Sequence, residues 1–267
     1  MSIFASTAFY NIQPPAAAAG FVVRTDGFSA SVQLALPCSL FSSAPISMAH
    51  YYSDISAVVR GTGTNLVAAP TGSASEFKSD TPNNFSADGY NGSLFTQDAG
   101  CWGQVSATRF AIGTQQFVSE GYFYFTEGFN KPPFWHSLVR QRENVNDDWF
   151  CDIGNGNNAT DVRMRMIING SQFFSPNFTI TLNTWVHVAW VRSTSGALYG
   201  YYNGTRRSIG TSTGNITSTG LVRILGGASA ANDGEAATHQ DLRITIGTDR
   251  GYNTATITPP LSIVTNA

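Results

Sequence analysis

Charged side chains are scarce in this chain, and lysine is nearly missing. Charged residues make up 12% of the 267 residues, roughly half the usual share. Lysine occurs only as Lys78 and Lys131. The formal net charge of −2 provides neither a basic field for nucleic acid nor a polybasic patch for a membrane surface. Nucleic acid and membrane are therefore not expected as partners.

Signals for disulfides, secretion and membrane insertion are equally sparse. The three cysteines, Cys38, Cys101 and Cys151, cannot form a fully paired framework and are expected to be small buried hydrophobes. The first 23 residues hold no Lys or Arg, so the charged start of a secretory signal is missing. No apolar run approaches the length that crosses a bilayer.

Short alternating runs dominate what is present. No window shows the 3.6-residue apolar period of a helix, and turn clusters separate the runs every ten to fifteen residues. This spacing predicts an all-β fold, an antiparallel two-sheet sandwich. The runs expected to form strands are 53–60, 92–96, 117–125, 136–141, 148–154, 162–168, 177–182, 221–227 and 241–247, together with the ribbons within 182–210.

The ribbons begin with LNTWVHVAWVRSTSGALYGYYNGT, residues 182–205. Alternation places one set of side chains on each face of the first ribbon. One set is Trp185, His187, Ala189 and Val191, and the other is Val186, Val188 and Trp190. Since both sets are largely apolar, this strand is expected to be central and covered on both sides. Asn203-Gly204 then predicts a tight turn with positive φ, so the segment forms a β-meander.

Residues 182–205 resemble the core of the laminin G-like branch of concanavalin A-like jelly rolls, in which a Trp and a His-Val-Ala strand precede an Asn-Gly hairpin. Other segments are similar to the family's motifs in the same order. They are HYYSDISAVVRGTGTN (50–65), GYNGSLFT (89–96), FVSEGYFYF (117–125) and DLRITIGTDRGYNTATITPP (241–260). The resemblance covers roughly residues 50 to 260 and implies a jelly roll there.

Domains of this type with the LRIT and TPP ending are frequent in tailed-phage virion proteins. The resemblance therefore implies a non-enzymatic structural protein of a virion, either a capsid decoration (cement) protein or a tail or fibre component. Its expected partners are other virion proteins such as capsid or tail subunits, and it is expected to form a homo-oligomer.

The organisation expected along the chain is an N-terminal segment, 1–48, followed by a jelly-roll domain, 49–267. Arg24 and Asp26 are the only charged residues of 1–48, so this segment is too apolar for a solvated tail. We expect it to be a docking or oligomerisation arm. Its anchoring aromatic residues would be Phe4, Phe9, Tyr10 and Phe21. The alternative is that 1–48 adds extra strands, such as SASVQLAL (29–36), to the same domain.

Catalysis is not expected. Glycoside hydrolases need two carboxylates around the scissile bond, and the Glu-x-Asp-x-x-Glu pattern of the laminarinase-like group does not occur. Glu120 lies between aromatic residues and is expected to be a structural hydrogen-bonding carboxylate. His187 is likewise expected to be a core histidine with its hydrogen bonds satisfied rather than a metal ligand.

Calcium is the one ion that the sequence suggests, and no other cofactor is expected. The segment 143–161 concentrates carboxylates among many Asn residues, and hard oxygen donors suit calcium. The expected ligands are Asp147, Asp148 and Asp152. A solvated acidic loop is the alternative, because the spacing matches no known calcium loop.

Binding of host-surface glycans without hydrolysis is the second functional hypothesis. Such sites use exposed aromatic rings with polar groups beside them, and the candidates are Trp135, Trp149 and Tyr202. Trp135 is preferred, because KPPFWH (131–136) is the most loop-like segment. Packing in the core is the alternative for each ring. In VRMRM (162–166), Arg163 and Arg165 are expected to face outward.

Overall fold

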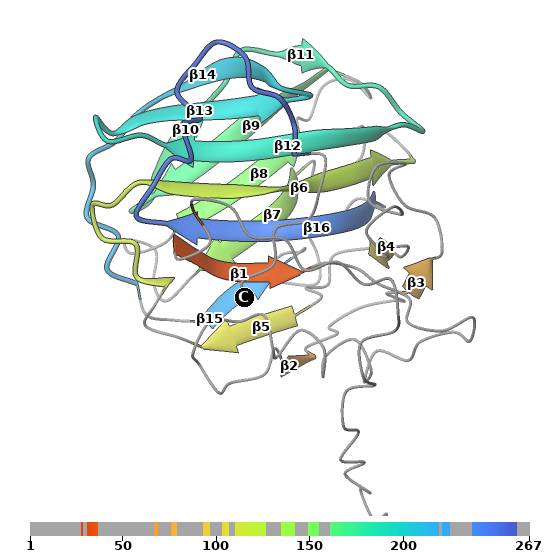
Figure 1. Ribbon diagram of the computed structural model, residues 1–267, viewed down its shortest axis with the longest axis horizontal. Helices are drawn as coiled ribbons and strands as arrows, with labels where there is room; N and C mark the ends of the chain where they lie inside the picture. Colours follow the sequence, from red (N-terminus) through yellow and green to blue (C-terminus); the bar gives the residue numbers. More distant parts are fainter. Residues whose placement is uncertain are drawn as a thin grey trace, which may run out of the picture.

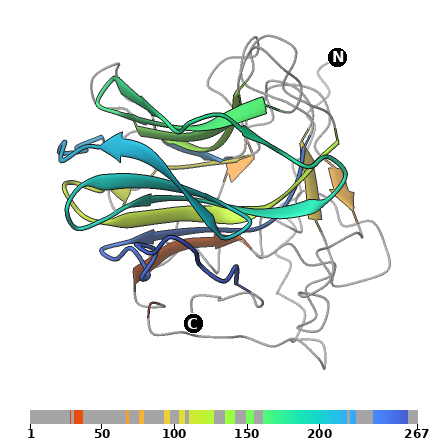
Figure 2. The same cartoon turned by 90° about the horizontal axis from the view of Figure 1, so that it is seen from above.

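The computed structural model shows a two-layered β-sandwich (Figures 1 and 2). It describes residues 28, 31–36, 67–68, 76–78, 93–96, 103–106, 110–126, 135–141, 149–154, 161–218, 221–224 and 237–260. Within these ranges the structure contains β-strands and no α-helix. No helix in this described part of the chain could span a membrane. The all-β antiparallel sandwich predicted from the alternating runs is therefore confirmed.

Eight strands form the first sheet, in the order β14-β13-β12-β6-β16-β4-β3, with β1 paired to β16. Their bounds are β1 Val32–Leu36, β3 Glu76–Lys78, β4 Ser93–Thr96, β6 Phe117–Phe125, β12 Trp185–Arg192, β13 Ala197–Tyr202, β14 Thr205–Thr211 and β16 Ala237–Ile246. The strands β12, β13 and β14 follow one another as the predicted meander.

Eight further strands form the second sheet, in the order β10-β9-β8-β7-β15-β5-β2, with β11 paired to β9. Their bounds are β2 Val67–Ala68, β5 Gly103–Ser106, β7 Trp135–Gln141, β8 Trp149–Gly154, β9 Asp161–Ile168, β10 Ser171–Phe174, β11 Phe178–Thr179 and β15 Leu221–Ile224. All of the pairings in both sheets are antiparallel.

The main core lies between the two sheets. Alternation sends Val186, Val188 and Trp190 of β12 inward, where they meet Met164 and Met166 of β9 in one buried cluster. A hydrogen bond joins the layers, because the Trp190 Nε1–H donates to the Asp152 carbonyl oxygen at 3.1 Å. The inward set of VRMRM is thus apolar, as predicted, and Arg163 and Arg165 are partly exposed on the other face.

A second, smaller cluster covers the outer face of the first sheet. Ala189 and Val191 of β12 are fully buried there, although they point away from the main core. Partly buried Tyr252 and Ile257 pack against them. The strand β12 lies between β13 and β6 and is covered on both faces, which confirms the expectation from its two apolar sets.

The covering segment, residues 247–260, is called the strap below. It follows β16 and crosses the outer face of the first sheet, on the side away from the second sheet (Figure 2, dark blue). Ile257 N–H donates to the Gly204 carbonyl at 2.8 Å, and Arg206 N–H donates to the Ala255 carbonyl at 3.0 Å. The strap therefore docks on the turn between β13 and β14.

That turn has the backbone that Asn-Gly predicts, with φ of 48° at Asn203 and 79° at Gly204. A Cβ at Gly204 would lie 2.3 Å from the Ile257 carbonyl oxygen, so glycine also permits the close approach of the strap. The same dipeptide recurs as Asn169-Gly170, with φ of 49° and 75°. It joins β9 to β10, a hairpin strand that the sequence prediction missed.

Several strand predictions change in extent. The run 177–182 shortens to β11, the run 241–247 lengthens at its start into β16, and the run 53–60 lies outside the described residues. Residues 32–36, placed by sequence in the N-terminal segment, pair with β16. This part of the segment is therefore an extra strand of the same domain, which was the alternative to a free arm. The boundary at residue 48 stays a prediction.

Candidate functional site

Four neighbouring strands of the second sheet bring aromatic rings and guanidinium groups together on its outer face. In the register, Trp135 of β7 pairs with Gly154 of β8, and Gly154 pairs with Arg163 of β9. In the next row, Asp152 of β8 pairs with Arg165, which pairs with Phe174 of β10. We call Trp135, Arg163, Arg165 and Phe174 the Trp135 cluster. Side chains of directly opposite residues, and of residues in the adjacent row, lie close enough on one face of the sheet to contact one another.

Each guanidinium group of the Trp135 cluster lies over one of its rings. The Arg165 Cζ lies 4.0 Å from the centre of the Trp135 ring, and the Arg163 Cζ lies 4.7 Å from the centre of the Phe174 ring. The two ring centres are 5.9 Å apart. The indole thus reaches across β8, where Gly154 has no side chain to block it. All four side chains are partly exposed.

Asp152 fixes the position of the Arg165 guanidinium through hydrogen bonds. One carboxylate oxygen of Asp152, Oδ2, accepts from Arg165 Nε at 2.8 Å and also from Nη2. The other oxygen, Oδ1, accepts from the Ser137 hydroxyl at 2.6 Å. Asp152 is fully buried, so its charge needs this cation. The guanidinium is thereby held over the indole ring, where cation–π attraction stabilises it.

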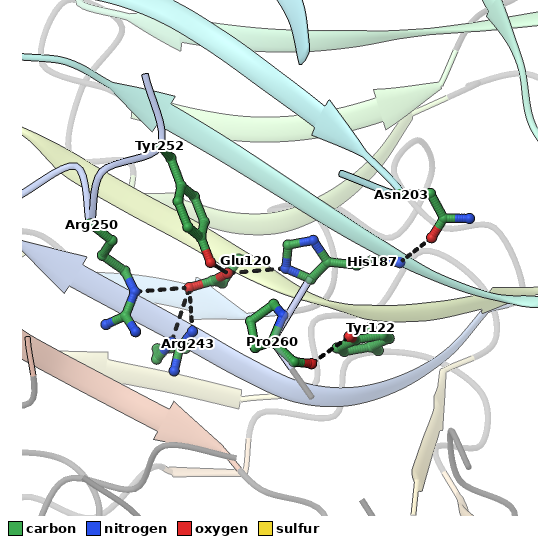
Figure 3. A network of polar contacts seen from close by, with 8 residues as sticks. All are labelled: Glu120, Tyr122, His187, Asn203, Arg243, Arg250, Tyr252 and Pro260. Atoms are coloured by element: carbon green, nitrogen blue, oxygen red, sulfur yellow. Dashed lines mark hydrogen bonds and ion pairs between the residues drawn. The ribbon is translucent and has the colours of Figure 1, made fainter. Parts of the chain in front are cut away.

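A second constellation lies on the outer face of the first sheet, around Glu120 in the middle of β6 (Figure 3). Glu120 Oε1 accepts from Arg243 Nη2 at 2.7 Å and from Nε at 3.0 Å. Its Oε2 contacts His187 Nε2 at 3.0 Å and accepts from the Tyr252 hydroxyl at 3.0 Å. Arg250 Nε lies 3.6 Å from Oε1. These five residues are called the Glu120 network.

The charge state of the Glu120 network follows from its partners. Burial alone would raise the pKa of the Glu120 carboxyl, but Arg243 opposes it first, followed by the hydrogen bond and charge of His187 and the charge of Arg250. The pKa of Glu120 therefore lies well below its usual range, and the carboxylate stays ionised. Burial, and then the charge of Glu120, raise the pKa of Tyr252, so its hydroxyl remains a donor.

The strap closes the Glu120 network off from solvent. Tyr252 and Arg250 belong to the strap, and Glu120 is 2% exposed. Further tyrosines of the sheet hold the strap down: the Tyr201 hydroxyl donates to the Thr254 carbonyl at 2.7 Å, and the Tyr122 hydroxyl donates to the Pro260 carbonyl at 2.6 Å. Glu120 thus has the buried, hydrogen-bonded surroundings expected of a structural carboxylate.

Two of the three predicted sugar-binding rings lie in the core, which corrects the prediction. Trp149 is fully buried on the same face of β8 as Cys151, and its Nε1–H donates to Gln141 Oε1 at 2.7 Å. Tyr202 is 8% exposed and packs on Phe178 with ring centres 5.1 Å apart. Neither ring offers a face to a ligand. Trp135 alone of the three is partly exposed.

One of the three aspartates predicted to bind calcium, Asp152, makes other contacts in the structure. Asp152 lies in β8, where Ser137 and Arg165 occupy both of its oxygens, so it belongs to no loop. Asp147 and Asp148 lie outside the described residues. Within the described part of the chain, no three His, Cys, Asp or Glu residues gather as a metal site would require. Calcium at the remaining two aspartates stays a prediction.

The residues predicted to anchor an arm, Phe4, Phe9, Tyr10 and Phe21, lie outside the described residues. The nearest described residue, Phe28, contacts the strap, because the Arg250 Cζ lies 5.1 Å from the centre of its ring. The arm hypothesis stays a prediction for the residues before it.

Sequence reasoning missed Phe174 as a member of the exposed cluster. The ring belongs to β10, a strand that was not predicted, and the signal that would have found it is Asn169-Gly170. Recognising that hairpin would have placed SQFF (171–174) beside β9, and alternation would have placed Phe174 next to the outward arginines.

Sequence comparison places the chain in no group: no protein-family model and no curated protein matches it. Solved structures do match in fold. Domain 4 of AbnA, an extracellular arabinanase from Geobacillus stearothermophilus solved in complex with arabinotriose, is 9% identical with a TM-score of 0.54. The match covers 85% of this chain and 98% of that one.

Two toxin domains also match in fold, each with a lower TM-score than the arabinanase domain. The binding domain of Paraclostridial Mosquitocidal Protein 1 has a TM-score of 0.50 at 11% identity, covering 84% of this chain and 51% of that one. The receptor-binding domain of botulinum neurotoxin type G has a TM-score of 0.50 at 11% identity, covering 83% and 49%. This chain thus spans about half the length of the toxin domains it matches. At such identities the likeness shows a shared β-sandwich fold.

Proposed function

We propose that this chain is a non-catalytic binding module that recognises carbohydrate through the Trp135 cluster. The observation that supports it most directly is the pair of partly exposed rings, Trp135 and Phe174, held 5.9 Å apart on the outer face of a sheet. Strand pairing sets the positions of these residues, and Asp152 fixes Arg165 against the indole, so the surface is formed before any ligand arrives. Preorganisation of this kind lowers the entropy cost of binding.

The chemistry of the cluster matches that of sugar-binding surfaces. The C–H face of a pyranose or furanose is apolar, and aromatic rings bury it while polar groups beside them bond the hydroxyls. The arginines supply such donors, and the exposed Gln172 on β10 supplies an amide. The Glu120 network is a weaker candidate, because the strap covers it.

The structural neighbours support a binding role on grounds of fold. The arabinanase domain was solved with arabinotriose, and the toxin domains are described as binding or receptor-binding domains. A shared fold does not transfer a ligand from one protein to another. The proposal therefore depends on the Trp135 cluster, and the neighbours make a sugar a reasonable first ligand to test.

A place in a tailed-phage virion is the finer hypothesis, and the resemblance of residues 50–260 is its support. A binding module of this kind would then act at the particle surface, with host glycans as ligands and other virion proteins as partners. The docking role falls on residues before Phe28, because residues 32–36 are already paired within the sandwich.

The test compares two tryptophans on opposite sheets. The full chain is applied to an array of plant, bacterial and animal glycans, as Trp135→Ala, as Trp185→Ala and unchanged. Trp185 is a matched control, because it is also partly exposed and contacts a neighbouring ring, that of Tyr124, with ring centres 5.6 Å apart. We expect Trp135→Ala to weaken binding at least tenfold, about 1.4 kcal/mol, and Trp185→Ala to leave it unchanged. Absence of glycan binding by the unchanged chain, or equal loss in both variants, contradicts the proposal.

A further inference from the structure

We infer that the Trp135 cluster binds two neighbouring sugar units of a twisted oligosaccharide, and that it binds flat, ribbon-like oligosaccharides poorly. This inference rests on the proposed function and names the shape of the glycan that the same surface would take. It follows from the distance and the angle between the rings of Trp135 and Phe174, and from the contacts that hold both rings in place.

The two rings lie beside each other and are inclined. Their centres are 5.9 Å apart, and their planes make an angle of 46°. The distance is comparable with the step from one sugar to the next in an oligosaccharide, so each ring can carry its own sugar unit. Since an aromatic ring buries the apolar face of a sugar, the planes of the two units would be inclined by a similar angle.

The twist of the sheet explains the inclination. Trp135 belongs to β7 and Phe174 to β10, and β8 and β9 lie between them. Adjacent strands of a sheet are rotated by roughly 20–25° relative to one another. Three such steps turn the outward direction of β10 away from that of β7. Side chains that lean toward each other from these two strands are therefore inclined, and the line between their rings crosses the strands.

Contacts within the cluster hold both rings at this angle. The Arg165 Cζ lies 4.0 Å from the centre of the Trp135 ring, and Asp152 accepts from Nε and Nη2 of the same guanidinium. The Arg163 Cζ lies 4.7 Å from the centre of the Phe174 ring. Each guanidinium covers one face of its ring, and both rings stay partly exposed, so a ligand meets the remaining ring surface. Making the rings coplanar for a flat ligand would disturb these contacts.

The shape of a glycan determines whether it fits inclined rings. In an extended ribbon such as cellulose, the planes of successive sugars are nearly parallel, so a ribbon lies best on coplanar rings. In arabinan, laminarin and amylose, successive sugars turn about the axis of the polymer. Such a ligand can place one sugar on Trp135 and the next on Phe174 without a change in either partner, and a preformed fit lowers the entropy cost of binding.

A single sugar unit that touches both rings is the competing explanation. The two explanations differ in how affinity depends on the length of the ligand. If one unit fills the cluster, a monosaccharide binds as tightly as its oligomers. If each ring carries a unit, the trisaccharide binds at least ten times more tightly than the monosaccharide, and longer oligomers add little.

The test measures binding to the whole protein by isothermal titration calorimetry. The twisted ligands are arabinohexaose, laminarihexaose and maltohexaose, the ribbon ligands are cellohexaose and mannohexaose, and the shorter oligomers with arabinose and glucose give the length dependence. We expect at least one twisted hexasaccharide to bind ten or more times more tightly than either ribbon.

The outcomes separate this inference from the proposed function. Ribbons that bind as well as the twisted ligands overturn the inference and leave the proposed function standing. A monosaccharide that binds as well as its oligomers does the same, and so does a protein that binds glycans of the array but no twisted hexasaccharide. A protein that binds no glycan at all overturns both.

Variants of single rings assign the effect to the ring pair. Phe174→Ala removes one of the two rings, so we expect it to abolish the gain from monosaccharide to trisaccharide and to leave monosaccharide binding unchanged. Phe174→Leu, which keeps an apolar side chain, replaces it if Phe174→Ala does not fold. Tyr124→Ala is the matched control, because the rings of Tyr124 and Trp185 on the other sheet also lie close, with centres 5.6 Å apart and planes at 57°. If the Phe174 variant keeps the full gain, or if Tyr124→Ala reduces it equally, the assignment to Trp135 and Phe174 is wrong.

Discussion

Replacing Glu120 by Gln should destabilise this fold more than most single substitutions, although Gln has nearly the same shape. The carboxylate is 2% exposed and lies within hydrogen-bond distance of Arg243, His187 and Tyr252. An amide keeps the volume and removes the charge. Arg243 is then left as a buried cation that has lost its carboxylate.

The expected cost follows from the loss of that ion pair. Removing one partner of a buried ion pair costs about 3–5 kcal/mol, and typical domains are stable by only about 5–15 kcal/mol. The double variant Glu120→Gln with Arg243→Met removes the cation as well. Because an apolar side chain can replace a buried charge at little cost, the double variant should be more stable than Glu120→Gln alone.

The effect should also depend on pH, and its sign is set by the lowered pKa of Glu120. A carboxyl whose pKa is lower in the folded than in the unfolded state stabilises the fold above its unfolded pKa, about 4.3. As the pH falls below that value, this contribution decreases by up to about 1.4 kcal/mol per pH unit. The difference in stability between the unchanged chain and Glu120→Gln should therefore shrink from pH 5 to pH 3.

The assay is urea denaturation followed by tryptophan fluorescence at pH 7, 5, 4 and 3, with the free energy of unfolding taken by linear extrapolation. We expect a difference of several kcal/mol at pH 7 and a smaller one at pH 3. A difference below about 1 kcal/mol at pH 7, or one that grows as the pH falls, would refute the account of Glu120 given above.

Two further substitutions test the turn and loop contacts. Gly204→Ala should destabilise the fold by about 1–3 kcal/mol, because it puts a Cβ at a positive φ and 2.3 Å from the Ile257 carbonyl oxygen. Hydrogen exchange should show faster exchange of the Ile257 N–H with no change at the β12 amides; unchanged exchange at Ile257 would contradict the close approach of the strap. Arg192→Lys should lower stability by about 2–4 kcal/mol, because the guanidinium donates to the carbonyls of Gln115, Gly113 and Gly214 at 2.6–2.9 Å. Calorimetry measures that loss, and an unchanged thermal midpoint would show these bonds to be dispensable.

Local sequence was sufficient for the elements with a clear period. FVSEGYFYF forms β6 with the predicted bounds, and the two apolar faces of β12 correctly placed it between other strands. Asn203-Gly204 predicted its own turn, because a two-residue hairpin needs positive φ and this dipeptide adopts it readily. Asn169-Gly170 contained the same information for β10, which was overlooked.

The sequence was a poorer guide to which face of a strand is exposed. Alternation shows that Trp149 and Asp152 lie on opposite faces of β8, but it does not say which face meets the other sheet. Trp149 was a candidate for an exposed sugar-binding ring, whereas the ring packs with Phe117 in the core, with ring centres 5.3 Å apart. Asp152, predicted to bind calcium, lies on the outer face under Arg165.

The sequence by itself determined the class of fold, the meander of 185–211 and the outward direction of Arg163 and Arg165, because these depend on neighbours within one strand or one turn. Only the tertiary structure decided that Trp135 meets Phe174 and that Glu120 meets Arg243, 123 residues away along the chain. Such contacts depend on strand order and register, which arise from packing the whole sandwich and leave no local pattern in the sequence.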